Sequence, residues 1–215
     1  MSVNFSLEGK VALVTGASYG IGFAIATAFA KAGATIVFND IKQELVDKGL
    51  AAYEAEGIKA HGYVCDVTNE EQVNAFVAQV EKEVGVIDIL VNNAGVSEST
   101  PFTEYTEETF DKVMDLNVKG VFNATRAASE CMIAKGQGVI LSTSSMVSIY
   151  GQPSGIAYPA SKFAVNGLTV SLARELGPKG IRVNAVAPGI TLTDMMKAVP
   201  KEVIDPLIKQ IPLRR

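Results

Sequence analysis

The sequence lacks tryptophan and contains only two cysteines and one histidine among its 215 residues. Cys65 and Cys131 are too few for a disulfide framework, and each lies in an apolar pattern, so we expect reduced core thiols in a cytoplasmic protein. His61 has no second histidine and no paired cysteine motif beside it, which excludes the usual metal sites. We therefore expect no bound metal and a packing or surface role for His61.

A strong excess of charge of one sign is also missing. Nineteen basic residues stand against twenty-three acidic ones, and no run is rich in lysine and arginine, so nucleic-acid binding is not expected. No apolar run approaches the roughly 18–20 residues of a membrane span. The N-terminus carries no basic region followed by an apolar one, as a secretion signal would. We expect a cytoplasmic protein that binds neither nucleic acid nor membranes.

With 48% hydrophobic residues, residues 1–215 are expected to form a single globular domain. Short β-branched runs, each typical of a buried strand, alternate with longer Ala-rich segments of helical period. The runs are 10–16, 34–40, 59–67, 86–95, 138–145 and 180–189. The helical segments are 20–32, 41–57, 69–85, 106–136 with a break near Asn117, and 160–176. This alternation predicts an α/β fold with a doubly wound parallel sheet.

The turn between the first predicted strand and helix has the sequence TGASYGIG and contains Gly16, Gly20 and Gly22. Such glycines permit a tight turn and a close approach of the backbone to a pyrophosphate, which then lies at the positive end of a helix. The position of this turn after the first strand favours dinucleotide binding. The alternative is a turn that serves packing alone.

Asp40 ends the second predicted strand, about 20 residues after the glycines. A carboxylate there can accept hydrogen bonds from the adenosine ribose and would repel the 2′-phosphate of NADP. Tyr19 occupies the position in the glycine turn where a basic residue would bind the 2′-phosphate. NAD is therefore favoured over NADP. Alternatively, Asp40 caps the following helix. Asp66, after the third strand, could accept from the adenine amino group or simply serve a turn.

Tyr158 is followed by Lys162 four residues later, which places both on one face of a helix. A free phenol titrates near ~10, and a nearby ammonium favours its ionised form, which brings proton exchange into a useful range. Pro159 is acceptable only in a first helical turn, so the helix should begin close to Tyr158. The spacing alone is common, but it follows a nucleotide-binding turn here.

Together, TGASYGIG, NNAG at 92–95, Asn117, Ser145, YPASK at 158–162 and PGITLT at 188–193 resemble the short-chain dehydrogenase/reductase family over essentially the whole chain. The resemblance implies a Rossmann-type fold and an NAD(P)-dependent enzyme. Such an enzyme transfers a hydride between nicotinamide and a small secondary alcohol or ketone. The competing hypothesis is a nucleotide-binding or scaffold protein that kept the fold and lost catalysis.

The resemblance also implies residue roles. Tyr158 would exchange the proton, and Ser145, or Ser144 in the adjacent register, would hydrogen-bond the substrate oxygen. Lys162 would bind the nicotinamide ribose and lower the pKa of the neighbouring phenol. Asn117 would hold a water that links Lys162 to solvent, unless it only kinks its helix. The residues expected to bind the cofactor are Gly16, Ser18, Tyr19, Gly20, Ile21, Gly22, Asp40, Asp66, Val67, Asn93, Gly95, Tyr158, Lys162, Pro188, Gly189, Ile190 and Thr193.

The C-terminal part departs from the family pattern. Family members usually continue through a seventh strand at the sheet edge, and this sequence stops before it, so we expect that strand to be missing. Residues 190–215 are punctuated by prolines and are expected to form a helical lid over the substrate. The segments 106–135 and 160–177 are apolar on more than one face, which predicts a homodimer, with a homotetramer weakened.

The sequence leaves the substrate open. The N-terminal half resembles gluconate 5-dehydrogenases, which favours a keto-sugar acid such as 5-ketogluconate. The C-terminal half resembles 3-oxoacyl-carrier-protein reductases and hydroxysteroid dehydrogenases, which favours a 3-oxoacyl thioester or a 3-oxosteroid. Substrate contacts are expected from 96–102, 146–156 and the segment after residue 190.

Overall fold

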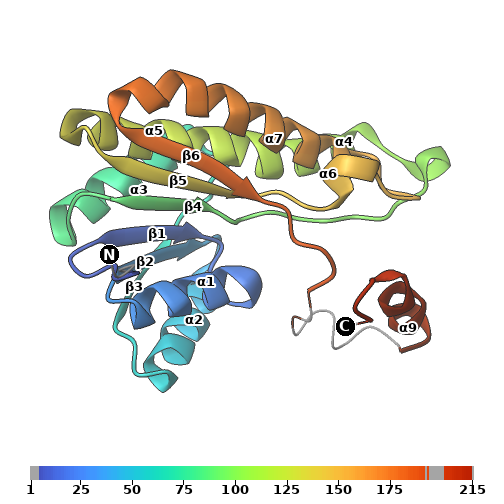
Figure 1. Cartoon of the computed structure of the whole chain (residues 1–215), viewed down its shortest axis with the longest axis horizontal. Helices are drawn as coiled ribbons and strands as arrows, with labels where there is room; N and C mark the ends of the chain where they lie inside the picture. The colour runs from blue at the N-terminus through green and yellow to red at the C-terminus, as the bar shows by residue number, and fades with distance from the viewer. Residues whose placement is uncertain (1–4, 192, 194–200, 215) are drawn as a thin grey trace.

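A parallel sheet with helices on both sides forms the centre of the molecule (Figure 1), in a computed structural model that describes residues 5–191, 193 and 201–214. The sheet has six strands in the order β3-β2-β1-β4-β5-β6, and all neighbouring strands pair in parallel. The strands are β1 (Val11–Thr15), β2 (Thr35–Asp40), β3 (Ala60–Val64), β4 (Ile89–Asn92), β5 (Gly138–Thr143) and β6 (Ile181–Val186). The doubly wound fold is confirmed, and its strand order reverses between β1 and β4.

Helices cover the sheet in two groups (Figure 1). On one side lie α1 (Gly20–Lys31) and α2 (Gln43–Ala55). On the other side lie α3 (Glu70–Glu83), α4 (Glu107–Met114), α5 (Gly120–Lys135) and α7 (Ala157–Leu176). The short elements are η1 (Phe102–Glu104), α6 (Val147–Tyr150) and η3 (Gly177–Lys179), and α9 (Lys201–Gln210) stands apart at the C-terminal end.

The alternation of side chains along the strands supplies two cores. Leu13, Val37, Leu90 and Ile140 point toward α3 and α5, where they pack with residues such as Phe76. The intervening strand residues point toward α1 and α2: Ala12, Val14, Ile36, Phe38 and Val91. Because successive residues of a strand face opposite sides of the sheet, one continuous apolar run fills both cores.

Helix starts follow the expected capping chemistry in two places. The Asn69 side chain accepts a hydrogen bond from the backbone N–H of Gln72 at 3.0 Å, and Thr106 accepts from that of Thr109 at 3.1 Å. Each cap satisfies an amide that has no partner inside its helix. The acidic first turns of α3 and α4 add a favourable interaction with the helix dipole.

The observed ends of several helices and strands differ from the predicted ones. Strands β3 and β4 are shorter than 59–67 and 86–95, because the residues that follow them turn into the site. Helix α7 begins at Ala157, three residues before the expected start, which places Pro159 in its first turn as required. In place of the predicted break near Asn117, a π-helical turn over Asp115–Lys119 joins α4 to α5, and the chain stays helical throughout.

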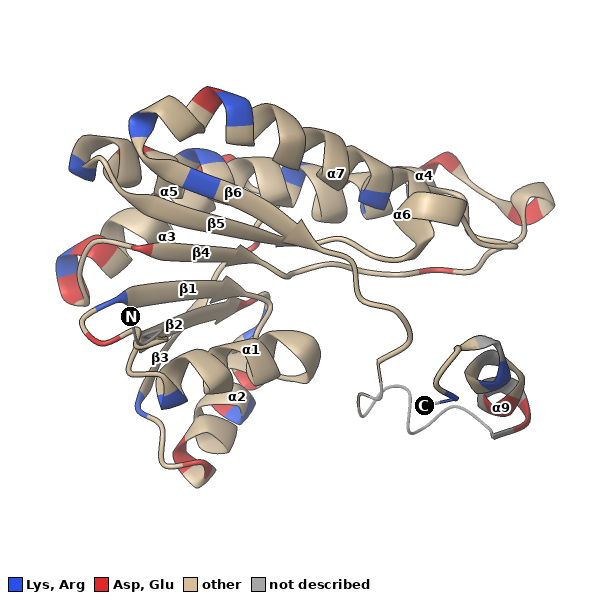
Figure 2. Ribbon diagram, in the orientation of Figure 1, with Lys and Arg blue, Asp and Glu red and all other residues tan. Residues whose placement is uncertain are grey.

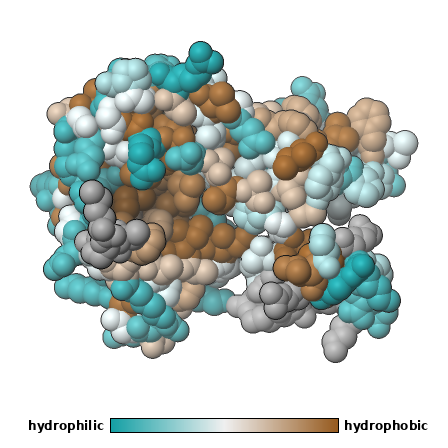
Figure 3. All heavy atoms as spheres, in the orientation of Figure 1, coloured by the Kyte–Doolittle hydropathy of each residue, from teal (hydrophilic) through white to brown (hydrophobic). Residues whose placement is uncertain are grey.

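One face of β5 is only partly covered. Val139 and Leu141 are half-buried, whereas Ile140 on the opposite face is fully buried. Figure 3 shows brown, apolar atoms in a hollow over this part of the molecule.

Among the described residues no helix is long and apolar enough to cross a membrane.

Asp88 joins three strands at the end of the sheet opposite the glycine turn. Its carboxylate is buried and accepts hydrogen bonds from the Lys135 ammonium, from Lys10 at 3.4 Å and from the backbone N–H of Val11 at 3.0 Å. Its backbone carbonyl accepts from Val139 at 3.0 Å. Burial opposes the ionisation of Asp88, but the hydrogen bonds and the charges of both lysines outweigh it and hold its pKa below the usual range.

We expect Asp88→Asn to lower the free energy of unfolding by about 1–3 kcal/mol at pH 7, because two lysines lose their counter-charge and one acceptor becomes a donor. A carboxylate with a lowered folded-state pKa stabilises the fold above its unfolded value of about 3.9 and loses that effect as the pH falls further. Urea denaturation at pH 7, 4 and 3 measures this. A gap between wild type and variant that did not narrow at pH 3 would contradict it.

Candidate active site

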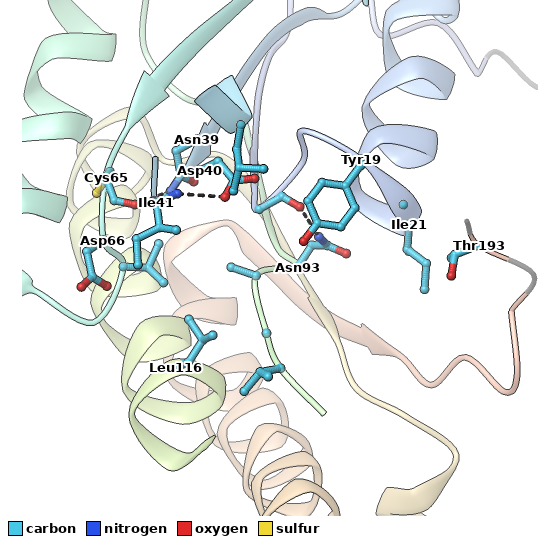
Figure 4. A pocket seen from close by; sticks show the side chains of 17 residues that line it. Tyr19, Ile21, Asn39, Asp40, Ile41, Cys65, Asp66, Asn93, Leu116 and Thr193 are labelled. Carbon is cyan, nitrogen blue, oxygen red and sulfur yellow. Dashed lines mark hydrogen bonds between the residues drawn. The ribbon is translucent and has the colours of Figure 1, made fainter. Parts of the chain in front are cut away.

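A cavity of about 510 Å³ opens at the carboxyl ends of the strands, beside the point where the strand order reverses. Figure 4 shows side chains from both halves of the sheet converging on it. The predicted residues that line it are Gly16, Tyr19, Gly20, Ile21, Asp40, Asp66, Val67, Asn93, Gly95 and Thr193. Open α/β sheets bind their ligands at this position, where loops diverge to either side.

The glycine turn is shaped by close backbone approaches. Gly16 has φ +60°, and a Cβ on it would lie 2.9 Å from Cα of Ala94. A Cβ on Gly22 would lie 2.5 Å from Nδ2 of Asn93, which shows how tightly the helix packs on the next loop. Gly20 has φ +66° and faces open space instead. Larger residues would therefore displace the turn at Gly16 and Gly22.

The N-terminus of α1 remains open to a ligand. Its N-cap residue, Tyr19, makes no side-chain capping bond, and no acidic residue lies in the first turn. The first amides and the positive end of the helix dipole thus face the cavity at Gly20 and Ile21. A pyrophosphate fits this arrangement, because backbone N–H groups and a partial positive charge are what an anion requires there.

Asp40 lies at the edge of the cavity and does not cap α2. Its Oδ1 accepts from the backbone N–H of Ile41 at 2.9 Å, while the N-cap of α2 is Lys42, without a side-chain bond. The alternative interpretation of Asp40 as a helix cap is therefore wrong. Asp66 both lines the cavity and serves its turn, since Oδ1 accepts from the N–H of Thr68 at 2.9 Å and from its hydroxyl at 2.8 Å.

Asn93 fastens the loop after β4 to the glycine turn. Its Nδ2 donates to the carbonyls of Thr15 and Gly16, both at 3.0 Å. In return, the hydroxyl of Thr15 accepts from the backbone N–H groups of Asn93 and Ala94, also at 3.0 Å. Neither loop can move without the other, so the floor of the cavity is rigid.

Tyr53 supports the glycine turn from α2, a role that no local pattern in the sequence indicates. Its side chain is fully buried, and its hydroxyl donates to the carbonyl of Ala17 at 2.7 Å across 36 residues of sequence. Burial raises the pKa of Tyr53, so the phenol stays protonated and remains a donor. The other residues that line the cavity were not among those expected to bind the cofactor: Asn39, Ile41, Leu45, Cys65, Ala94, Val96 and Leu116.

Lys162 and Tyr158 meet on one face of α7, as the spacing predicts. The Lys162 Nζ lies 5.7 Å from the centre of the Tyr158 ring and donates to the carbonyl of Thr143 at 2.8 Å. Only 5% of Lys162 is exposed, and this burial lowers its pKa to about 8. The ammonium is therefore a buried cation beside a half-buried phenol.

Asn117 lies within the π-helical turn and is fully buried. Its amide nitrogen donates to the carbonyl of Val96 at 2.9 Å and to the hydroxyl of Ser161 at 3.0 Å, and its oxygen accepts from the N–H of Val96 at 2.8 Å. A Cβ on Gly95 would lie 3.0 Å from the Asn117 oxygen and 3.7 Å from Nζ of Lys162. Gly95 is thus where the cavity adjoins the Tyr158–Lys162 face.

The two candidate serines have different surroundings. The Ser144 hydroxyl is held by Asn166 at 2.7 Å and by Ser148 at 3.1 Å. The Ser145 hydroxyl accepts a long bond of 3.4 Å from the N–H of Val147, and its hydrogen has no acceptor among the described residues. Ser145 is therefore free to donate to a ligand, and Ser144 is committed to the packing of α6 against α7.

Several predicted cofactor residues lie outside the cavity lining. Ser18 is 2% exposed, with a hydroxyl that has no partner among the described residues, and Gly22 packs beneath the turn. The Pro188 carbonyl accepts from the N–H of Met146 at 3.0 Å, and Gly189 approaches the Met146 sulfur. The other predicted residues outside it are Tyr158, Lys162 and Ile190. No cluster that could hold a metal occurs in the described part of the chain.

Comparison with known proteins yields a consistent set of relatives. A family model described as short chain dehydrogenase matches residues 10–203. A 3alpha-hydroxysteroid dehydrogenase from Mediterraneibacter gnavus is 56% identical over 211 residues, which cover 97% of this chain and 84% of that protein. A 3-oxoacyl-(acyl-carrier-protein) reductase from Thermotoga maritima is 43% identical, with 97% and 85% covered.

A solved structure of 2-keto-3-deoxy-D-gluconate dehydrogenase from Streptococcus agalactiae matches with a TM-score of 0.83 and 49% identity. The match covers 99% of this chain and 83% of that one. The fold similarity therefore extends over nearly the whole of this chain.

Proposed function

Since this chain belongs to the short-chain dehydrogenase/reductase family of NAD(P)-dependent oxidoreductases acting on CH–OH groups, we propose that it interconverts 3α-hydroxysteroids and 3-oxosteroids. The observation that carries the proposal is the exposure of large apolar side chains in the segments 96–102 and 146–156. They are Phe102 (72%), Ile149 (72%), Tyr150 (63%) and Ile156 (42%), and polar residues such as Ser97 and Thr100 lie in the same segments. A rigid hydrocarbon ring system is the substrate class that such a surface favours.

Charge supports the same substrate class. Residues 96–102 and 146–156 contain no lysine or arginine, and Figure 2 shows no blue on α6 within the second segment. A sugar acid therefore finds no cation in these segments for its carboxylate. The one carboxylate in these segments, Glu98, is hydrogen-bonded by Tyr105 at 2.6 Å. The 56% identity to a 3alpha-hydroxysteroid dehydrogenase favours the same substrate class.

The catalytic roles follow from the positions of four side chains. We propose that Tyr158 takes the hydroxyl proton during oxidation and returns it during reduction, with Ser145 as the donor that holds the substrate oxygen. The Lys162 ammonium stabilises negative charge on the phenolic oxygen during this transfer. Asn117 joins Val96 to Ser161 of α7 by hydrogen bonds, and we propose that it holds a water that links Lys162 to solvent. The bound nicotinamide supplies or accepts the hydride.

The segment 190–215 is proposed as a lid over the substrate. Thr193 already lines the cavity, and α9 provides a helix beyond it. The expected contributions of residues 194–200 lie outside the described residues. Closure of such a segment would exclude water from the reacting atoms.

We propose NAD as the preferred cofactor because of the surroundings of the adenosine end. Asp40 lines the cavity with one oxygen bonded to a backbone N–H and the other free to accept from ribose hydroxyls. A 2′-phosphate would meet this carboxylate, and Tyr19 supplies no positive charge in the glycine turn. Like charges at close range disfavour the phosphorylated cofactor.

A homodimer is proposed through α5 and α7. Phe122 and Phe163 are 47% and 51% exposed on these helices, and Val170 is 62% exposed. Val121 and Val165 on the same helices are buried in the protomer's own core, so the exposed phenylalanines must carry the contact. A twofold contact between two such faces covers apolar surface that one protomer leaves in water.

We expect the wild-type protein with NAD to oxidise 3α-hydroxysteroids faster than gluconate or 3-hydroxyacyl thioesters. The rate of NADH formation, followed by absorbance, measures this. Faster turnover of a sugar acid would overturn the steroid proposal.

Tyr158→Phe removes only the hydroxyl, so the turnover of this variant should fall by about 10²–10⁴-fold, while a fluorescence titration should show unchanged binding of NADH. A variant that kept more than about a tenth of the wild-type rate would overturn the role of Tyr158.

Asp40→Ala should narrow or reverse the preference for NAD over NADP, because the variant no longer repels the 2′-phosphate. Dissociation constants of both reduced cofactors, measured by fluorescence, give the ratio. Asp66→Ala serves as the comparison, since Asp66 lines the same cavity on a different loop. An unchanged ratio in Asp40→Ala would mean that the ribose is recognised elsewhere.

Light scattering at micromolar concentration should give a dimer for the wild type. Phe163→Glu should give a monomer, because it places a charge at the centre of the proposed contact. Phe5→Glu is the control, since Phe5 is 82% exposed but lies on neither α5 nor α7. A monodisperse wild-type monomer would refute the interface.

A further inference from the structure

Helix α7, which carries Tyr158, begins without a cap from its own segment. Its N-cap residue, Ile156, has no capping side chain, and Pro159 lacks an N–H. The N–H of Ala160 bonds to the carbonyl of Ile156 at 3.2 Å. The N–H of Ala157 has no acceptor inside the helix, because the first amides of a helix never do.

Tyr105 supplies the missing acceptor from 52 residues earlier in the chain. The N–H of buried Ala157 donates to the Tyr105 hydroxyl at 3.3 Å. That hydroxyl in turn donates to Oε1 of Glu98 at 2.6 Å. Burial and the hydrogen bond to Glu98 raise the pKa of Tyr105 to about 12, so the phenol stays a donor. The three groups form a directed chain that ends on a carboxylate.

The same carboxylate holds the rest of its loop. The second oxygen of Glu98 accepts from the N–H of Thr100 at 2.9 Å, and its backbone carbonyl accepts from Gln152 at 3.0 Å. The Gln152 amide also donates to the carbonyl of Gly155 at 2.8 Å, and the N–H of Gly155 donates to the carbonyl of Thr100 at 3.0 Å. Residues 98–105 and 152–157 are thus joined at several points.

Gly155 makes this contact sterically possible. It has φ +78°, and a Cβ on it would overlap the carbonyl oxygen of Glu98. The two loops therefore touch through their backbones immediately before α7 begins. Because the structure around Ala157 is fixed from outside the helix, the direction of the next side chain, Tyr158, depends on that contact.

We propose that Glu98 and Tyr105 are positioning residues that hold the start of α7 and thereby aim the hydroxyl of Tyr158 at the substrate. Neither is a catalytic residue: Tyr105 acts through Ala157, and Glu98 acts through Tyr105. The inference rests on the proposed role of Tyr158 in proton exchange. It assigns to the loop after β4 a function in orientation, in addition to its apolar contact with the substrate.

The chain offers a matched control elsewhere. The Tyr63 hydroxyl donates to Oε2 of Glu83 at 2.9 Å, and this pair links β3 to α3 at the other edge of the sheet. It has the same chemistry as the Tyr105–Glu98 pair, but it joins two elements that are separate from α7. Tyr63→Phe therefore measures the cost of losing a tyrosine–glutamate hydrogen bond without any effect on α7.

The first measurement needs neither substrate nor cofactor. Hydrogen exchange of the peptide covering 155–160, followed by mass spectrometry, should be about fivefold faster in Tyr105→Phe, the change expected for loss of one helix cap. Exchange in β5 should be unchanged. In Tyr63→Phe the 155–160 peptide should exchange as in wild type. Equal exchange of this peptide in Tyr105→Phe and wild type would overturn the cap.

The second measurement follows turnover with the substrate that wild type oxidises fastest. Tyr105→Phe should lower kcat by about 10–100-fold, because small displacements of a reacting group have effects of this size. The KM for the cofactor should not change, and Tyr63→Phe should keep the wild-type kcat. An unchanged kcat, or an equal fall in both variants, would overturn the positioning role.

A double variant tests whether Glu98 acts through Tyr105. Glu98→Ala should lower kcat, and adding Tyr105→Phe to Glu98→Ala should lower kcat by a smaller factor than Tyr105→Phe does in the wild type. Additive losses would overturn the directed chain. These outcomes are separate from those of the proposed function: retained turnover in Tyr158→Phe would refute the role of Tyr158, while the exchange measurement would still decide whether Tyr105 caps α7.

Discussion

The close contact between the glycine turn and the loop after β4 is the constraint on which the site depends. Gly16 and Ala94 approach so closely that no side chain fits between them, and Asn93 and Thr15 bond the two loops together. This contact sits where the strand order reverses. It leaves the start of α1 beside the cavity on one side and brings Gly95 close to Lys162 on the other, so one junction borders both the cavity and the Tyr158–Lys162 face.

Burial of Lys162 is the second determining feature. A lysine that is 5% exposed would lose much of its hydration, and its pKa falls to about 8 as a result. The carbonyl of Thr143 at the end of β5 compensates in part. The charge is thus held beside Tyr158 in a medium that screens it weakly, which makes its influence on the phenol larger than at an exposed position.

The surroundings of α7 show how orientation is obtained from distant parts of the chain. Ser144 and Asn166 fix the helix on the side of β5, while Tyr105 contacts its first residue from the loop after β4. The segments 96–102 and 146–156, from which substrate contacts are proposed, are therefore joined by hydrogen bonds to each other and to the start of the helix. The proposed coupling between substrate contacts and the direction of Tyr158 runs through these bonds.

The sequence by itself determined the strand–helix alternation, the glycine turn, and the face shared by Tyr158 and Lys162. These features depend on periods and spacings within a few residues, which local patterns encode. Only the tertiary structure decided that Tyr53 supports the glycine turn, that Asp40 does not cap α2, and that Ser145 rather than Ser144 keeps a free hydroxyl. Such contacts join residues tens of positions apart and arise from sheet order and loop packing, which leave no periodic trace in the chain.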